Sequence, residues 1–174
     1  MDDTEPVPPR GLRERLRWTT DDGAIHDGAR RYLMMRPDVL MGMLRRLPAD
    51  DRARAFAAFA ESIRDHGIDS IRAYFAQVGD DPPALLAATA RAAADLGWGA
   101  WRFEPGRDRL GLTVDASPFA AGFGAASEPV CAPIAGMLEA VTTVATGIDC
   151  DVREVRCAAC GAPRCEFEAS WAAC

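Results

Sequence analysis

Three cysteines and one glutamate in the last third of the sequence are spaced like metal ligands. Cys131 is predicted to open a helix and Glu154 to lie near the end of a strand; Cys157 then starts a turn, and Cys165 begins the returning strand. A hairpin would place Cys157 opposite Cys165, and a helix N-terminus over it would deliver Cys131 as a thiolate. Zinc binds thiolates and carboxylates tetrahedrally, and four protein ligands leave no position for a catalytic water. The set therefore predicts a closed structural zinc site.

Other readings of the cysteines stay open at this point. Cys157 and Cys160 form a Cys-x-x-Cys pair, so an all-cysteine site with Cys160 in place of Glu154 is the main alternative. The same pair is also a redox motif, but that chemistry needs a thioredoxin-like βαβ setting, which the sequence does not predict. A third possibility is that the cysteines are unconnected small apolar residues in an alanine-rich chain.

The composition limits the classes of function. A chain of 174 residues with net charge −6 fits one domain and argues against a general binder of nucleic acid or anionic membranes. Every basic residue is arginine, which excludes a lysine Schiff base. The sequence has no apolar run of about 18 residues and no secretory signal, so we expect a cytoplasmic protein. Clustered cysteines there favour metal binding over disulfides.

The order of predicted elements indicates an α+β domain. Residues 1–20 are expected to be a mobile arm with a short basic helix, and residues 21–97 to be helical. Helices are predicted from Pro37 to about residue 47, over 48–67, over 70–78, over 82–97 and over 129–146. Strands are predicted over 98–103, 110–114, 150–156 and 164–171. Two hairpins imply a four-stranded antiparallel sheet packed by helices, with residues 98–174 as the ligand- and zinc-binding part.

The inventory of catalytic groups favours a noncatalytic protein. The sequence lacks a dinucleotide fingerprint after a strand and a Ser-His-Asp constellation, and it has two histidines. Apolar side chains are available to line a ligand pocket, with core packing as the alternative for each. The candidates are Tyr74, Trp98, Trp101, Phe119, Phe123 and Met137, with His66 as a polar candidate that could instead be an exposed helix cap.

The sequence resembles the 4-vinyl reductase domain family, named for a bacteriochlorophyll-biosynthesis protein, and the sensor domains of phenol- and hydrocarbon-responsive transcription activators. The resemblance covers about residues 98–167. It is carried by Ser117-Pro118-Phe119, Glu128-Pro129-Val130-Cys131, Gly136, Glu154-Val155-Arg156-Cys157, Gly161 and Cys165-Glu166-Phe167. In those sensors zinc is held by a Cys opening a helix, a Glu, a Cys three positions later and a Cys eight positions further. The resemblance thus implies Cys131, Glu154, Cys157 and Cys165 as ligands, with Cys160 free.

The resemblance also implies a fold and a function. The expected fold is that of an acyl-chain-enclosing trafficking subunit, with helices against a twisted antiparallel sheet, a buried apolar pocket near the zinc hairpin, and a homodimer. Since the chain lacks a phosphate-binding loop and a helix-turn-helix, we expect it to sense or carry a hydrophobic or aromatic ligand, or to signal through another protein. The alternatives are a component of bacteriochlorophyll or tetrapyrrole biosynthesis that acts on or presents a vinyl-bearing pigment, and a zinc-stapled interaction scaffold.

Overall fold

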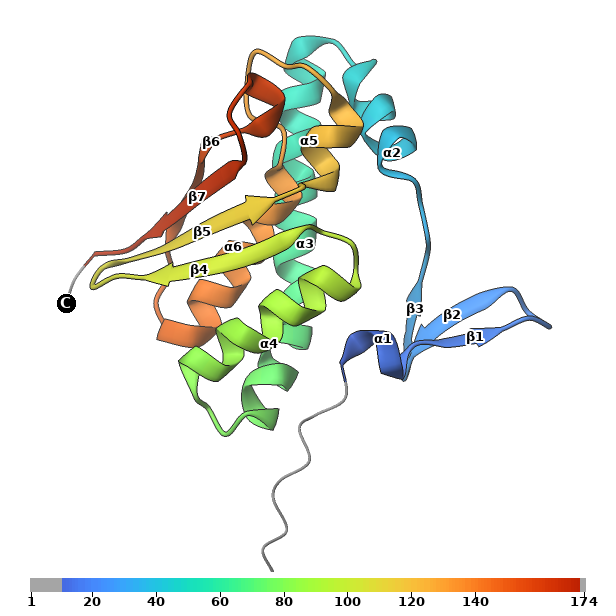
Figure 1. The fold of residues 1–174 in the computed structure, drawn as a ribbon, viewed down its shortest axis with the longest axis vertical. Helices are drawn as coiled ribbons and strands as arrows, with labels where there is room; N and C mark the ends of the chain where they lie inside the picture. Colours follow the sequence, from blue (N-terminus) through green and yellow to red (C-terminus); the bar gives the residue numbers. More distant parts are fainter. Residues whose placement is uncertain (1–10, 173–174) are drawn as a thin grey trace, which may run out of the picture.

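The larger of two sheets is antiparallel and four-stranded, and helices cover one of its faces (Figure 1). This computed structural model describes residues 11–172. The strand order is β4-β5-β7-β6. The strands are β4 (Ala100–Pro105), β5 (Arg109–Asp115), β6 (Asp151–Arg156) and β7 (Cys165–Ser170). The predicted α+β class and both predicted hairpins are confirmed.

Alternation along the central strands creates the buried face of this sheet. Leu112 and Val114 on β5 pair with Phe167 and Cys165 on β7, and all four side chains are buried. Because successive residues of a strand point to opposite faces, these side chains lie together on the face that meets the helices. The same alternation directs the Cys165 thiol into the interior.

The helix layer is built around two helices that approach each other closely. The helices of the body are α2 (Pro37–Arg45), α3 (Ala49–Gln77), α4 (Pro82–Asp95), α5 (Pro118–Phe123) and α6 (Ala132–Thr146), with a 3-10 turn η1 (Ala158–Cys160). Helix α6 lies between the sheet and α3 (Figure 1). At their crossing a Cβ on Gly136 would lie 2.1 Å from the Ala60 carbonyl oxygen, so the contact requires glycine.

Helix α3 is longer than the sequence predicts. A helix ending near Gly67 and a second helix over 70–78 were expected, but α3 is continuous across this region. Glycine inside a helix costs about 1 kcal/mol relative to alanine. Here Gly67 lies against α6, where an added Cβ would be 2.9 Å from the Met137 Cε atom. Packing of α3 on α6 outweighs the local preference to stop.

The N-terminal segment is only partly as predicted. Residues 1–10 of the expected mobile arm lie outside the described residues. The following residues form α1 (Leu12–Arg15), β1 (Arg17–Thr19), β2 (Ala24–Asp27) and β3 (Arg30–Tyr32), where an arm and a helical region were expected. Strands of three or four residues are too short for alternation to reveal them. Among residues 11–172, no helix has the length and apolar character needed to cross a bilayer.

Candidate metal centre and ligand cavity

The four predicted metal ligands come together at one end of the sheet. Their ligand atoms all lie within 4.8 Å of one another. Cys131 is the N-cap of α6, and Glu154 lies on β6. Cys157 precedes η1, and Cys165 is the first residue of β7. The predicted delivery of one cysteine by a helix N-terminus over a hairpin therefore has the geometry expected from the sequence.

A bulge in β6 makes the Glu-x-x-Cys spacing possible. Residues three apart on a regular strand face opposite sides of the sheet. Glu154 pairs with Phe167 and Arg156 with Glu166, so the register shifts between Glu154 and Arg156. Val155 and Arg156 are both exposed, whereas Cys157 is buried. The extra residue thus returns Cys157 to the side on which the carboxylate of Glu154 lies.

The distances fit a small tetrahedral ion. The Sγ atoms of Cys131 and Cys165 are 3.6 Å apart. Zinc–sulfur bonds of about 2.3 Å in a tetrahedron would separate two sulfurs by about 3.8 Å. Glu154 Oε2 accepts the backbone N–H of Cys131 at 2.8 Å. Its other oxygen, Oε1, is buried and has no hydrogen-bond donor among the described residues, so it is free to act as a ligand.

The electrostatics of the cluster also favour a cation. Burial, followed by contact with the Cys157 thiol, raises the pKa of Glu154 to about 8. Contacts with the Cys131 and Cys165 thiols lower the pKa of Cys157, while the same kind of contact with Cys157 raises the pKa of Cys131. The acidic groups therefore compete for few protons in a buried space. A divalent cation would neutralise them together, since metal coordination deprotonates a thiol outright.

The neighbouring polar groups support the sulfurs, and Cys160 stands apart. The Ala158 N–H donates to Cys165 Sγ at 3.3 Å, and Ser117 Oγ lies 3.3 Å from Cys131 Sγ. Cys160 is exposed and does not belong to the cluster formed within residues 11–172. Glu154, and not Cys160, therefore completes the group that can hold a metal ion.

A second feature is an apolar cavity of about 220 Å³ between α3, α4 and β4. Five of the seven predicted pocket residues line it: His66, Tyr74, Trp98, Trp101 and Met137. Other lining residues include Leu12, Tyr32, Ile63, Gly67, Ile71, Thr89 and Ala93. An apolar cavity of about 150 Å³ is enough to bind benzene. The cavity can therefore accept a molecule of one aromatic ring.

Two predicted pocket residues have another place. Phe119 does not line the cavity but stands behind it, with its ring edge-on to Trp98 at 5.1 Å between centroids. Phe123 packs against Phe56 at 6.0 Å, away from the cavity. Both side chains are buried. They belong to the core that supports the wall of the cavity, because α5 faces α2 and not α4.

Three lining residues were not singled out from the sequence. Leu12 and Tyr32 belong to the segment expected to be arm or helix, so no signal linked them to a pocket. Thr89 lies in an alanine-rich helix, where a hydroxyl gives little indication of its surroundings. A helical-wheel projection of 82–95 would have placed Thr89 between Leu85 and Ala93 on the buried face.

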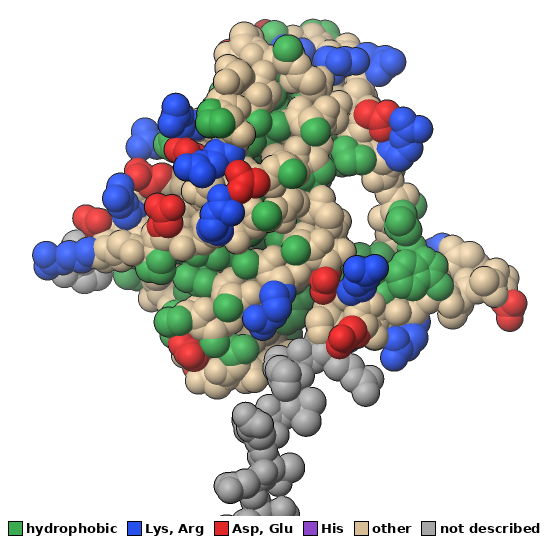
Figure 2. Space-filling view, viewed as in Figure 1, with side chains coloured by type: hydrophobic (Ala, Val, Ile, Leu, Met, Phe, Trp, Pro, Cys, Tyr) green, Lys and Arg blue, Asp and Glu red, His purple; other side chains and the backbone are tan. Residues whose placement is uncertain are grey.

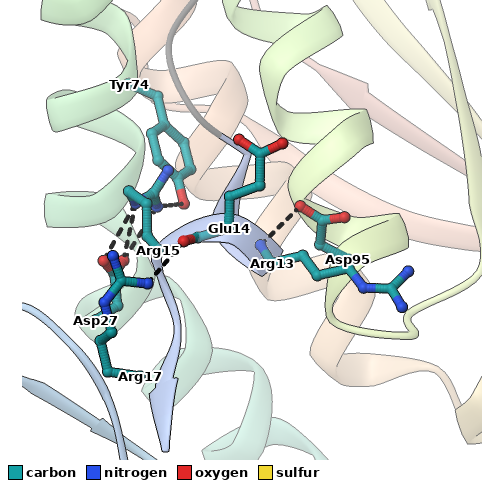
Figure 3. A network of polar contacts seen from close by, with 7 residues as sticks. All are labelled: Arg13, Glu14, Arg15, Arg17, Asp27, Tyr74 and Asp95. Carbon is teal, nitrogen blue, oxygen red and sulfur yellow. Dashed lines mark hydrogen bonds and ion pairs between the residues drawn. The ribbon is translucent and has the colours of Figure 1, made fainter.

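The N-terminal segment closes one side of the cavity and is fastened to α3 and α4 (Figure 3). Arg15 binds the Asp27 carboxylate, with Nη2 and Oδ2 3.0 Å apart, and donates to the Tyr74 hydroxyl at 3.2 Å. Its guanidinium also lies 5.6 Å from the centre of the Tyr74 ring. The backbone N–H of Arg13 donates to Asp95 Oδ2 at 3.1 Å.

Helix α6 connects the metal centre with the cavity. Cys131 caps this helix, and Met137 projects from it into the cavity wall. Six residues of α-helix correspond to about 9 Å. The expectation of an apolar cavity near the cysteine cluster thus agrees with the structure.

Comparisons with known proteins agree with this architecture. Residues 110–170 match the model of the 4-vinyl reductase domain family, so the predicted resemblance is confirmed over that segment. The phenol-responsive sensory domain of the transcription activator PoxR, solved with phenol, is similar in structure. Its TM-score is 0.78 at 20% identity, and the match covers 91% of this chain and 86% of that one. No curated protein matches the sequence.

Two further solved structures are more distant. A trafficking protein particle complex subunit 3 from Naegleria fowleri, covalently bound to palmitic acid, has a TM-score of 0.50 at 13% identity, covering 77% of this chain and 93% of that one. A vinyl-4-reductase family protein from Methanocaldococcus jannaschii has a TM-score of 0.48 at 13% identity, covering 80% and 96%. The first of these shares the fold expected from the sequence.

Proposed function

We propose that this chain is a sensory domain that binds a small hydrophobic or aromatic molecule in the cavity between α3, α4 and β4. The cavity itself carries the proposal: it is about 220 Å³ in volume and lined by Trp98, Trp101 and Met137. Ligand sites are mostly apolar with few polar groups, and this cavity has that character. The structural similarity to a phenol-responsive sensory domain supports the same role.

The size of the cavity favours a single-ring ligand. Pockets for drug-sized ligands span about 300–1,000 Å³, whereas this cavity is smaller. A tetrapyrrole pigment is much larger than one aromatic ring. We therefore prefer a sensor or carrier of a small molecule to a component of tetrapyrrole synthesis.

We also propose that Cys131, Glu154, Cys157 and Cys165 bind zinc in a structural site. Three thiols and a carboxylate oxygen with no hydrogen-bond donor form a closed donor set that suits zinc. When bound, zinc would tie the start of α6 to the β6–β7 hairpin. Because four protein ligands fill a tetrahedron, the proposed metal contributes to folding and not to turnover.

A homodimer is the assembly we propose. Large apolar side chains are exposed on the segment between β3 and α2 and on α2 itself: Leu33, Met34, Met35, Val39 and Met43. Figure 2 shows hydrophobic side chains along this segment where it passes the body of the molecule. A second copy would remove that surface from water. Sedimentation equilibrium of the full chain and of Met35→Lys tests this, because a dimer held by this surface should dissociate in the variant.

Native mass spectrometry of the purified full chain, followed by a phenol titration, tests the proposed function. We expect one zinc per chain and any bound organic molecule as additional mass. Saturating phenol, at about 100 times its Kd, should raise the melting temperature by about 5 to 10 °C. Trp98 and Trp101 line the cavity, so tryptophan emission should change too, and Trp18→Phe should keep this response because Trp18 is exposed.

The outcomes separate the parts of this proposal. No thermal shift and no emission change with phenol or toluene at millimolar concentrations would refute a single-ring ligand. A spectral change with a porphyrin, but none with phenol, would instead favour the tetrapyrrole alternative. Zinc bound in the absence of any ligand response would leave the scaffold alternative.

A further inference from the structure

One polar group inside the cavity has no partner. Thr89 lies in the middle of α4, its side chain is 3% exposed, and it lines the cavity. Its Oγ1 atom has no hydrogen-bond partner among the described residues. Its helix neighbours on the same face, Leu85 and Ala93, are buried and apolar. The hydroxyl thus sits in apolar surroundings with its hydrogen-bonding capacity unused.

This arrangement is unusual for a threonine in a helix. Threonine hydroxyls in helices commonly donate to the carbonyl four residues earlier, which here is that of Leu85. Thr146 on α6 shows this behaviour in the same molecule, with Oγ1 2.8 Å from the Thr142 carbonyl oxygen. Buried polar groups are nearly always hydrogen-bonded, so an unpaired hydroxyl beside a cavity indicates a partner that occupies the cavity.

Other polar side chains on the wall are less suited to this task. The Trp101 indole N–H already donates to the Trp98 carbonyl at 3.0 Å, and the Tyr74 hydroxyl accepts from Arg15. His66 is exposed, and Ser70 is half-buried. Among these groups, Thr89 combines the deepest burial with an unused hydrogen-bonding atom.

We propose that Thr89 is the polar anchor of the cavity, and that the ligand is a single-ring aromatic molecule carrying a hydroxyl group that bonds to Thr89 Oγ1. This inference rests on the proposed ligand-binding function and adds the ligand class and the residue that selects it. The hydroxyl of the ligand can donate to or accept from threonine, and the apolar wall surrounds the ring. A site built around a buried hydroxyl rejects an analogue that leaves it unpaired.

The test compares phenol with toluene, which have nearly the same shape and differ by a hydroxyl in place of a methyl. Dissociation constants of both are measured by calorimetry for the full chain and for Thr89→Val, which replaces the hydroxyl by a methyl. We expect Thr89→Val to weaken phenol binding about tenfold while toluene binding stays unchanged or tightens. Thr89→Ser keeps the hydroxyl and should retain the preference for phenol, which guards against a packing effect.

Ser70→Ala is the matched control, because it removes a less buried hydroxyl that lines the same cavity. It should leave the ratio of phenol to toluene affinity unchanged. An equal loss of both ligands in Thr89→Val, or no loss of either, would overturn the anchor while leaving the ligand cavity intact. Failure of the unsubstituted chain to bind either probe would overturn the proposed function, and the anchor with it.

Discussion

The sulfur of Cys131 lies 3.6 Å from the sulfur of Cys165, although 34 residues separate the two in the chain. One caps α6 and the other starts β7, so an ion between them would tie the helix layer to the sheet. Cys157 and Glu154 complete the group from the bulged end of β6. Each substitution in this group should therefore affect both metal content and folding.

Replacing Cys157 with serine should abolish zinc binding and destabilise the protein. We expect zinc, measured by elemental mass spectrometry, to fall from one per chain to none. The free energy of unfolding should drop by about 4 kcal/mol or more, a loss typical of removing a structural metal. Cys160→Ser is the matched control, because Cys160 is exposed and outside the cluster. If Cys160→Ser loses the metal and Cys157→Ser keeps it, the ligand assignment is wrong.

Thiol reactivity should report the same arrangement without substitutions. In the zinc-loaded protein we expect maleimide to modify the exposed Cys160 first. Cys150 should react slowly, because it is half-buried and burial raises the pKa of its thiol to about 11. Cys131, Cys157 and Cys165 should react only after a chelator removes the metal. Peptide mapping by mass spectrometry measures each site, and early modification of Cys157 before chelation would argue against a metal-bound thiolate.

Two glycine-to-alanine substitutions at the interface of α3 and α6 should have opposite effects. At Gly67 the added Cβ meets only the flexible end of Met137, which can move, so removing a helix-interior glycine should stabilise the protein by about 1 kcal/mol. At Gly136 the added Cβ meets the Ala60 backbone, which cannot move cheaply, and a loss of about 3 kcal/mol is expected. Urea unfolding measures both.

The Gly67→Ala variant has a second consequence. Gly67 and Met137 both line the cavity, so the displaced methionine should reduce its volume. Phenol should therefore bind more weakly to a protein that is more stable. Stabilisation accompanied by unchanged or tighter phenol binding would mean that the ligand does not occupy this cavity.

The contact of Arg15 with Asp27 and Tyr74 should hold the N-terminal sheet against α3 (Figure 3). In Arg15→Ala we expect faster hydrogen exchange of backbone amides in β1, β2 and β3, with little change in the larger sheet. The reason is that the substitution removes both the ion pair and the stacking on the Tyr74 ring. Arg13→Ala is the control, since the bond from residue 13 to Asp95 comes from its backbone. Equal exchange in both variants would show that Arg15 does not hold the segment.

The sequence by itself determined the metal-ligating set and the class of fold. Local spacing carried both, because a helix start at Cys131 and a hairpin from Cys157 to Cys165 are read from neighbouring residues. The aromatic and methionine residues of the cavity wall were identifiable as apolar, and five of the seven predicted pocket residues line one cavity.

Only the tertiary structure decided which of those residues share a space. Phe119 and Phe123 have the same chemical character as Trp98, but α5 faces α2, and this places them in the core. Helix α3 continues through Gly67 because packing against Met137 outweighs a local preference of about 1 kcal/mol. The hydroxyl of Thr89 acquired a role when α3, α4 and β4 enclosed it, because hydrogen bonding of a buried atom depends on residues distant in sequence.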